Sequence, residues 1–525
     1  MVNLSRGRCL DLLPLPPPPL SISGLPRELT RTLNVESRSL DNIKTNNEPL
    51  HKGLQYDEAR PFPAEITSIE VLSGPNASQK IFKVDLSFPI HLTELSKWIP
   101  GDSIGITPKN QDADLDTITS HLIIPSPEII HKGVPCLVRS LLQNIDFDAS
   151  LTKKALIRLL STFARNPIEM NQLLFVCSRS GLKNYSHLVT QQWSFLDLLE
   201  TFPSLSIPIQ VILEHFERLK PRWYSIVAPP TTTNYFSEDG LMHESATNKN
   251  CSISIVVGYC RYTLPPLQPN QPETIRIGLV SGQIHHMITS NLTLNVLPIF
   301  PRPKTMKPLL HLRPLDQRKE IVCLAGGTGL AGLMSFIYQQ AFLIAQNPAK
   351  STPHLHVFYA SREGEEIFLG ELNNVITPSS SPVISITIAI SRSSDKYVHA
   401  LTSRYPNLDV VHGYITPKLS TWLESRSTSR PLESLLSKVS LSQPCTNDPI
   451  PNNPVPPILS DCVFLVCGSM RFITGVRTTF SNYLHEYVID ALCDGQADDS
   501  QVPAKTKTLL RELERSGVIK IECWG

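Results

Sequence analysis

A glycine-rich turn, Gly327-Thr328-Gly329-Leu330-Ala331-Gly332, lies between a short apolar run and a stretch with helical spacing. It matches G-x-G-x-x-G, in which glycines let backbone N–H groups approach a pyrophosphate at the positive end of a helix. No Lys-Ser or Lys-Thr follows, so the turn is not the phosphate loop of a P-loop protein. On its own, the spacing is equally typical of a tight turn that serves only packing.

Cations and hydroxyls follow the next two apolar runs. Arg362 follows the first of these runs, and the second is followed by Ser391, Arg392, Lys396 and Tyr397. A dinucleotide with a free 2′-hydroxyl usually meets Asp or Glu at this point, whereas cations suit a 2′-phosphate. Any one of these residues is also typical of a solvated charged rim. The set therefore favours NADPH over NADH.

A second group of residues lies earlier in the chain. Arg222-Trp223-Tyr224-Ser225 opens one strand-like run, and Gly278-Leu279-Val280-Ser281 ends a later one. An arginine for a phosphate, an aromatic for a flat ring and a hydroxyl near the reactive atom suit a flavin nucleotide. The Gly-then-Ser segment can contact the flavin's pyrophosphate through backbone N–H groups. Taken separately, each segment is also an ordinary strand end.

The elements that position these residues are predicted from hydrophobic periodicity. Short strand-like runs indicate a small antiparallel β-barrel, and they cover 64–72, 81–88, 223–227, 253–259 and 275–280. Helical spacing over about 112–217 predicts a helical insertion in this barrel. Strands alternating with helices predict a doubly wound parallel sheet, with strands at 321–325, 355–360, 383–390 and 463–466.

We predict three regions from this pattern, which together make an α+β and α/β chain. Residues 1–60 form a disordered Pro-rich leader, and 61–300 form the barrel domain with its helical insertion. Residues 301–525 form the doubly wound domain, interrupted by a flexible insertion at about 424–460. The leader and this insertion hold the densest of the 45 prolines, so the excess of Pro over the 24 glycines does not belong to the folded domains.

Composition excludes several classes of protein. The 48 basic and 47 acidic residues give a net charge of +1, which argues against a dedicated nucleic-acid or polybasic membrane protein. Residues 321–349 lack charge, but their Gly, Gln and Asn content favours a buried strand, turn and helix over a membrane span. The adjacent His285 and His286 have no Cys or carboxylate near them in the sequence, so we predict no metal site.

The eleven cysteines form no C-x-x-C pair, which is typical of reduced thiols in a cytoplasmic protein. Cys462 and Cys467 lie five residues apart across a predicted strand. Because side chains alternate along a strand, we expect these two thiols on opposite faces of the sheet, where they cannot form a redox pair.

The order of these motifs resembles the ferredoxin–NADP reductase superfamily, and more closely the FAD/NADPH half of diflavin reductases. The motifs are R-x-Y-S, G-x-x-S, G-T-G-L-A, S-R…K-Y-V, C-G and a penultimate Trp. The stretch from Cys136 to Tyr224 is most similar to the helical connecting domain of the methionine synthase reductase group. The resemblance covers about 61–525, apart from the insertion at 424–460.

The resemblance implies an FAD-binding domain at 61–300 and an NADP-binding domain at 301–525. It assigns one set of residues to FAD, namely Arg222, Trp223, Tyr224, Ser225, Gly278, Leu279, Val280, Ser281 and Trp524. It assigns a second set to NADPH, namely Gly327, Thr328, Gly329, Arg362, Ser391, Arg392, Lys396, Tyr397 and Val398.

The same resemblance implies the catalytic residues. Ser225, Cys467 and Glu522 would form the polar cluster around flavin N5, with Cys467 beside the nicotinamide. Trp524 would stack on the flavin and swing aside for hydride transfer. Electrons would then pass to cobalamin-dependent methionine synthase or to a separate flavodoxin-like FMN protein. No nucleic acid and no membrane span are expected.

Four departures from the family pattern bear on turnover. Both prolines of the usual G-P-G-T-G-I-A-P are replaced, by Gly326 and Gly332. Ser469 stands for the Asp of C-G-D, Glu522 for an Asp, and His399 for the Gln after K-Y-V. One added methylene moves a carboxylate by more than an ångström, which matters at a catalytic site.

The stretch before Pro61 is too short to hold the flavodoxin-like FMN domain of diflavin reductases. We therefore expect a separate acceptor, a partial product or a changed role. Two alternatives stay open: a reductase for a flavodoxin, ferredoxin or cytochrome-type partner, and a catalytically impaired FAD/NADP-binding regulatory protein.

Overall fold

The computed structural model divides the 525-residue chain into two compact units, each described here by itself. The first unit contains 107–222 and 260–286, and the second contains 61–106, 223–259 and 287–523. Within these ranges the structure describes residues 61–73, 77, 79–89, 101–131, 133–147, 153–190, 192–227, 235–236, 242–243, 250–264, 274–289, 296–302, 320–346, 353–362, 368–376, 383–427, 459, 462–492 and 502–523.

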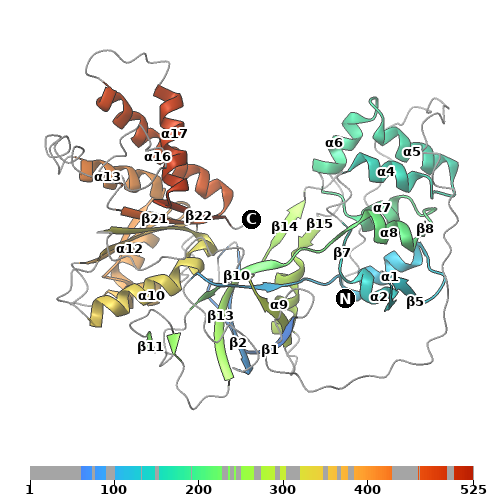
Figure 1. Cartoon of the computed structure of the whole chain (residues 1–525), viewed down its shortest axis with the longest axis horizontal. Coiled ribbons are helices and arrows are strands. Elements are labelled where there is room, and N and C mark those ends of the chain that lie inside the picture. Colours follow the sequence, from blue (N-terminus) through green and yellow to red (C-terminus); the bar gives the residue numbers. More distant parts are fainter. Residues whose placement is uncertain are drawn as a thin grey trace, which may run out of the picture. The chain divides into compact units, whose positions relative to one another are not determined.

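The first unit is mainly helical, as the spacing over 112–217 predicts (Figure 1). Its helices are α1 (Asp112–Ser120), α2 (Val138–Leu142), α4 (Lys154–Ser161), α5 (Pro167–Cys177), α6 (Leu182–Thr190), α7 (Phe195–Thr201) and α8 (Ile209–His215). Their core contains three packed rings: Phe195 stacks on Phe147 at 5.3 Å and meets Phe216 edge-on at 5.1 Å. Sequence periodicity missed the short strands β4 (Leu122–Ile123), β5 (Glu128–His131), β6 (Val134–Leu137), β7 (Ile145–Asp146), β8 (Ile207–Pro208) and β9 (Glu217–Arg218).

The prediction of a barrel strand over 275–280 is wrong. β15 (Thr274–Ile277) ends before Gly278 and pairs with β14 (Arg261–Leu264) in a two-stranded sheet outside the barrel. The next residues begin helix α9 (Leu279–Thr289). A short apolar run cannot distinguish a strand from a buried helical turn, and Gly278 is the point where one changes into the other.

The β-barrel of the second unit is closed and antiparallel, which confirms the predicted fold class. Its strand order is β1-β16-β3-β10-β13-β2. These strands are β1 (Phe62–Val71), β2 (Ile81–Pro89), β3 (Ser103–Ile106), β10 (Arg222–Val227), β13 (Asn250–Gly258) and β16 (Val296–Pro301), and a separate small hairpin pairs β11 (Tyr235–Phe236) with β12 (Met242–His243). Strand β2 alternates buried and half-buried side chains over most of its length, as a strand lining a barrel core must.

The second layer of this unit is a six-stranded parallel sheet, in the order β20-β19-β18-β17-β21-β22. Its strands are β17 (Glu320–Gly326), β18 (His354–Ser361), β19 (Ile384–Ile390), β20 (Asp409–His412), β21 (Cys462–Gly468) and β22 (Ile519–Cys523). Continuous apolar runs predict β17, β18, β19 and β21 correctly. β20 and β22 were not predicted, because their short sequences are too polar to stand out.

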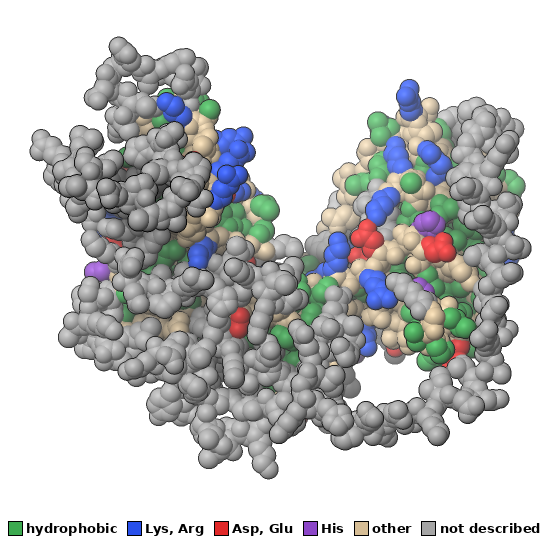
Figure 2. Space-filling view, in the orientation of Figure 1, with side chains coloured by type: hydrophobic (Ala, Val, Ile, Leu, Met, Phe, Trp, Pro, Cys, Tyr) green, Lys and Arg blue, Asp and Glu red, His purple; other side chains and the backbone are tan. Residues whose placement is uncertain are grey.

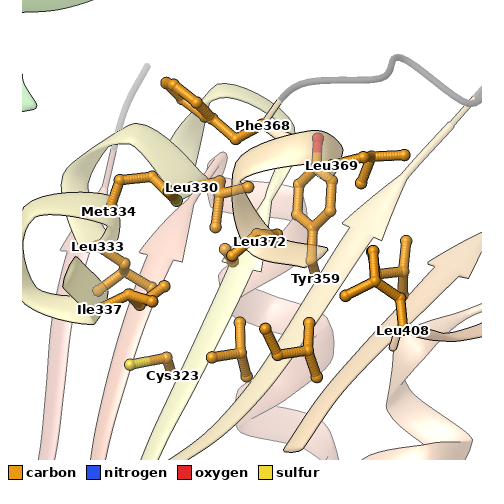
Figure 3. Close-up of a cluster of buried hydrophobic side chains, with 14 of the residues drawn as sticks. Cys323, Leu330, Leu333, Met334, Ile337, Tyr359, Phe368, Leu369, Leu372 and Leu408 are labelled. Atoms are coloured by element: carbon orange, nitrogen blue, oxygen red, sulfur yellow. The ribbon is translucent and has the colours of Figure 1, made fainter. Parts of the chain in front are cut away.

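Helices cover both faces of the parallel sheet (Figure 1). α10 (Leu330–Gln346), α11 (Leu369–Val375) and α12 (Asp395–Arg404) pack on one face, where Leu330, Leu372 and Tyr359 meet in a buried cluster (Figure 3). α13 (Ile415–Ser427), α16 (Met470–Leu492) and α17 (Val502–Arg515) pack on the other. Cys467 belongs to the first cluster and Cys462 to the second, which confirms that the two thiols face opposite sides.

The described part of the run without charge, 321–346, folds as the buried strand β17, a turn and helix α10. In the ranges that the structure describes, no helix combines the length and apolarity needed to cross a bilayer.

A buried ion pair joins the β14–β15 hairpin to helix α7 within the first unit. Asp197 is fully buried, and the Arg276 guanidinium donates a hydrogen bond to its carboxylate. Ser194, the N-cap of α7, completes the network: its hydroxyl accepts from the Asp197 backbone N–H at 3.2 Å and from Arg276 at the same distance. The hairpin that leads to Gly278 is thus held by a charge pair with almost no access to water.

Arg276→Ala should destabilise the chain by about 3–5 kcal/mol, because it leaves the Asp197 carboxylate buried without its cation. Urea unfolding followed by circular dichroism measures this change. Arg261→Ala is the matched control, since Arg261 is an exposed arginine on the paired strand β14. Equal effects of the two substitutions would show that the Arg276–Asp197 pair does not stabilise the hairpin.

Candidate functional site

The glycine turn joins β17 to α10 and lies directly against the end of β21. Residues Gly327–Gly329 form a single 3₁₀ turn, and Gly327 has φ +55°, a conformation that favours glycine. A Cβ added at Gly329 would lie 2.3 Å from the carbonyl oxygen of Cys467 and 2.8 Å from the Cα of Gly468. Only glycine therefore allows the two backbones to approach this closely.

This contact lies where the strand order of the sheet reverses. β18, β19 and β20 extend on one side of β17, and β21 and β22 extend on the other. In open parallel sheets, ligands bind outside the carboxyl ends of the strands at such a reversal. The glycine turn and the Cys467–Ser469 segment both lie at this edge of the sheet.

The structure brings the backbones of the predicted 2′-phosphate residues together at the same edge. The Arg392 N–H donates to the Arg362 carbonyl oxygen at 2.7 Å, and the Ser391 N–H donates to the Ser361 carbonyl oxygen at 3.1 Å. The side chains of Arg362 and Arg392 are both exposed. Two cations at the ends of adjacent strands are thus available to an anion.

The remaining predicted residues of this group lie in the first turn of α12. Ser394 caps the helix by accepting from the Tyr397 N–H at 3.3 Å, Lys396 is exposed and Tyr397 is partly buried. Val398 is buried in the hydrophobic cluster beneath. Sequence reasoning did not weigh Asp395, whose carboxylate lies 3.1 Å from His412 Nδ1 beside these cations.

The Arg222–Ser225 segment forms strand β10. Trp223 meets Phe300 edge-on at 5.5 Å, and Tyr224 is partly buried. Ser225 is buried, and its Oγ has no hydrogen-bond partner among the described residues. Val227, two residues further on, belongs to the cluster that contains α10. Because side chains alternate along a strand, Trp223 and Ser225 lie on this same face of β10.

Arg222 begins the same strand but belongs to the first unit. Its side chain is exposed and donates to the Lys220 carbonyl oxygen at 3.0 Å.

Glu522, the second-to-last residue of strand β22, is buried. Glu522 pairs with Cys467 in the parallel register of β21 and β22, and only 6% of its surface is exposed. Its Oε1 accepts a hydrogen bond from Arg302 Nη1 at 3.2 Å, whereas Oε2 has no hydrogen-bond partner in the described part of the chain. Burial raises the pKa of the Glu522 carboxyl above its ordinary value, and Arg302 partly offsets this rise.

Arg302 therefore connects the barrel to the last strand of the parallel sheet. Its guanidinium lies 5.7 Å from the Trp223 ring centre and also holds Glu522. Sequence reasoning missed Arg302, because it belongs to no motif and its partner is 220 residues away. Arg302 directly follows β16, and this position was the only signal that the sequence carried.

The Gly278–Ser281 segment begins α9 in the first unit. The Ser281 hydroxyl accepts from the Cys260 N–H at 3.1 Å, and the Gly278 N–H donates to the Cys260 carbonyl oxygen at 2.8 Å. Leu279 is partly buried and Val280 is buried. The Gly and Ser of this motif thus fix the change from strand β15 to helix α9.

Ser469, which stands for the usual Asp, lies at the start of α16. It is exposed, and its hydroxyl accepts from the Phe472 N–H at 3.4 Å. His399 is exposed on α12. Trp524, the leader at 1–60 and most of the predicted insertion (428–458) lie outside the described residues. No group of three or more His, Cys, Asp or Glu side chains that could hold a metal ion occurs in the described ranges.

Comparison with known proteins agrees with this architecture. Residues 55–235 match the family described as FAD binding domain. An uncharacterized FAD-binding protein of Schizosaccharomyces pombe is 28% identical over 377 residues, which cover 66% of this chain and 61% of the relative. Methionine synthase reductase of Homo sapiens is 23% identical over 398 residues, covering 68% and 51%. Inducible nitric oxide synthase of Mus musculus is 24% identical over 324 residues, covering 58% and 25%.

The chain thus spans between a quarter and about three fifths of the length of these relatives. Together with the barrel and the parallel sheet, the matches show that this chain is similar to FAD-binding proteins.

Glu522→Gln should make the chain more stable relative to the natural protein as the pH rises. A carboxyl whose pKa is raised by folding contributes stability below its ordinary value of 4.5 and loses that contribution as the pH rises through the folded value. Glutamine does not titrate, so it does not lose stability in this way. The measurement is the free energy of unfolding in urea, from just below that ordinary value up to neutral pH.

Glu65→Gln is the control, because Glu65 is exposed on β1. If both variants show the same pH dependence relative to the natural protein, the inferred pKa shift of Glu522 is wrong.

Proposed function

We propose that this protein is an NADPH-dependent FAD oxidoreductase. The observation that carries the proposal is the junction at Arg302, which places the buried carboxylate of Glu522 beside the Trp223–Ser225 face of the barrel. When bound, the flavin would accept a hydride from NADPH and deliver electrons to an acceptor.

The residues present suit a flavin on the barrel side of the site. Ser225 Oγ and Glu522 Oε2 are buried polar atoms without a hydrogen-bond partner in the described ranges, and such atoms are usually satisfied by a ligand or water. Trp223 offers a partly buried aromatic ring on the same face of β10 as Ser225, and Tyr224, the next residue, is also partly buried. The FAD-binding domain match at 55–235 covers this strand. The assignment of Arg222 and of Gly278–Ser281 to the same cofactor is supported by the sequence motifs.

The residues at the edge of the parallel sheet suit NADPH. The N–H groups of Gly327–Gly329 at the start of α10 would bind the pyrophosphate. Arg362 and Arg392, with Ser391, Lys396 and Tyr397 beside them, would bind the 2′-phosphate, because an arginine fork matches phosphate oxygens. Val398 would support the start of α12 by packing in the hydrophobic core.

The chain's own residues would then handle the proton at flavin N5. Glu522 Oε2 would take up or release this proton, and the Ser225 hydroxyl would donate or accept a hydrogen bond at the same atom. Cys467, which is opposite Glu522 in the strand register, would lie beside the nicotinamide. Trp524 would cover the flavin until the nicotinamide arrives.

The acceptor proposed here is the one suggested by the human relative. The alignment with methionine synthase reductase covers 68% of this chain at 23% identity. We therefore propose cobalamin-dependent methionine synthase, or a separate flavodoxin-like FMN protein, as the electron acceptor. A cytoplasmic location agrees with the absence of C-x-x-C pairs in the sequence. A ferredoxin- or cytochrome-type acceptor is the alternative within this class.

A second candidate function is a regulatory protein that binds FAD and NADP without turnover. Ser469 favours it, because its hydroxyl caps α16 where the family has a carboxylate. Glu522 is longer than the usual Asp and is engaged by Arg302.

Arg392→Ala should raise the KM for NADPH by about ten- to a hundredfold and leave the KM for NADH nearly unchanged. The loss corresponds to one charge-assisted hydrogen bond to a phosphate, about 1.5–3 kcal/mol. Steady-state reduction of ferricyanide by the FAD-loaded protein measures both constants.

Arg511→Ala is the matched control, because Arg511 is exposed on α17, over which Figure 2 shows several Lys and Arg side chains. Equal effects of Arg392→Ala on the two nucleotides would refute the 2′-phosphate assignment.

A further inference from the structure

We propose that Arg302 is a positioning residue that orients the Glu522 carboxylate and keeps it ionised, so that Oε2 can take up a proton. This inference rests on the proposed flavin site, and it adds to that site a residue that none of the sequence motifs contains.

Arg302 is anchored on the barrel. It directly follows β16, and its backbone N–H donates to the Ser103 carbonyl oxygen of β3 at 3.0 Å. The side chain is only 20% exposed and therefore has little freedom to move. From this fixed origin the guanidinium lies over the Trp223 ring, 5.7 Å from its centre, in a cation–π contact.

Trp223 is a rigid support for this guanidinium. Its ring packs edge-on against Phe300, with 5.5 Å between the ring centres. Gly105 leaves the space for this pair, since a Cβ at that position would lie 2.5 Å from the Phe300 ring and 2.8 Å from Trp223. The position of Arg302 is therefore set by the barrel rather than by the carboxylate that it holds.

Arg302 engages one oxygen of Glu522 and leaves the other available. Nη1 donates to Oε1 at 3.2 Å, and Oε2 accepts no hydrogen bond from the described residues. A bidentate arginine pair would have occupied both oxygens. A single contact instead fixes the carboxylate while its second oxygen can accept a proton.

Arg302 also opposes the effect of burial on the Glu522 charge. Burial favours the neutral carboxylic acid, and the charge and hydrogen bond of Arg302 both favour the carboxylate. Among the described residues, the strand register places two further titratable side chains next to Glu522: Cys467, its partner on β21, and Lys520, two residues earlier on β22. Cys467 is fully buried, and a thiol carries no positive charge. Arg302 is the cation that the structure shows in hydrogen-bond contact with the Glu522 carboxylate.

The step that this arrangement serves is a proton transfer without electron exchange. The bond between the donor atom and its proton breaks, an O–H bond forms at Glu522 Oε2, and the donor retains the electron pair. If Glu522 were already protonated, Oε2 could not accept this proton. Keeping the carboxylate ionised is thus the specific contribution of Arg302.

The first test uses the cofactor-free protein and does not depend on activity. The pKa of Glu522 is measured by ¹³C NMR titration of carboxyl-labelled glutamate, and its signal is identified by its loss in Glu522→Gln. We expect Arg302→Gln to raise this pKa further and Arg302→Lys to give an intermediate value, because lysine restores the charge but not the planar fork. An unchanged pKa in Arg302→Gln would overturn the proposal.

Two controls separate this role from a general loss of structure. Arg511→Gln removes an exposed arginine on α17 and should leave the Glu522 titration as it is. Circular dichroism and thermal unfolding establish that each variant folds. If Arg302→Gln fails to fold, Arg302→Lys decides instead. The Glu522 signal is assigned by its loss in Glu522→Gln. A Glu522 pKa in Arg302→Lys equal to that of the natural protein would then overturn the proposal.

The second test uses the FAD-loaded protein and NADPH. Arg302→Gln should slow turnover with ferricyanide by about tenfold at neutral pH. This is less than the roughly hundredfold or more that a general acid or base contributes, because Glu522 itself is retained. The pH profile of Arg302→Gln should shift in the direction of the NMR pKa, and kcat should change more than the KM for NADPH. A shifted NMR pKa with an unshifted pH profile would overturn the proton-acceptor role.

The two tests fail in distinguishable ways. If the natural protein binds FAD but is not reduced by NADPH, the proposed function fails, whereas the NMR titration still decides whether Arg302 sets the charge of Glu522.

Discussion

The carbonyl oxygen of Cys467 lies where a side chain at position 329 would begin. This close approach, 2.3 Å from the Cβ that Gly329 lacks, brings the turn after β17 and the end of β21 into backbone contact. It places the start of α10 beside the residues that precede α16, at the point where the strand order reverses. The candidate site at this edge depends on it, because any larger residue would force the glycine turn away from Cys467.

The barrel approaches the same turn from its own strands. A Cβ at Gly258, the last residue of β13, would lie 3.4 Å from the Thr328 side chain. Ile81, Val227 and Val256 of the barrel share one buried cluster with Leu330 and Ala331 of α10. The Arg302–Glu522 pair adds a polar connection between barrel and sheet. Apolar packing and one buried ion pair thus position the groups to which we assign chemistry.

Much of this fold could be predicted from the sequence, because its strands are continuous apolar runs ended by glycine or by polar residues. Such runs identify β17, β18, β19 and β21, and the parallel sheet follows from their alternation with helices. The run at 275–280 was misassigned because its apolar residues suit both a strand and a helix. β22 was missed because alternating Lys and Glu interrupt its apolar residues, although Cys467 and Glu522 meet through it.

The site shows a similar division between local and distant information. The glycine turn and the cations after β18 and β19 are local motifs, and a single sequence is enough to find them. Arg302 and Glu522 are 220 residues apart, and no spacing rule relates them. Their pairing depends on how β16 and β22 are placed by two different layers, which only the folded chain reveals.

The proposed function requires that one chain holds FAD and NADPH so that hydride passes between them. The most direct test mixes the FAD-loaded protein with one equivalent of NADPH in the absence of oxygen, and follows the visible flavin absorption by stopped-flow spectroscopy. We expect rapid bleaching with NADPH and much slower bleaching with NADH. Retention of FAD with no bleaching by NADPH would show that hydride does not pass between the two cofactors and would favour a binding protein without turnover.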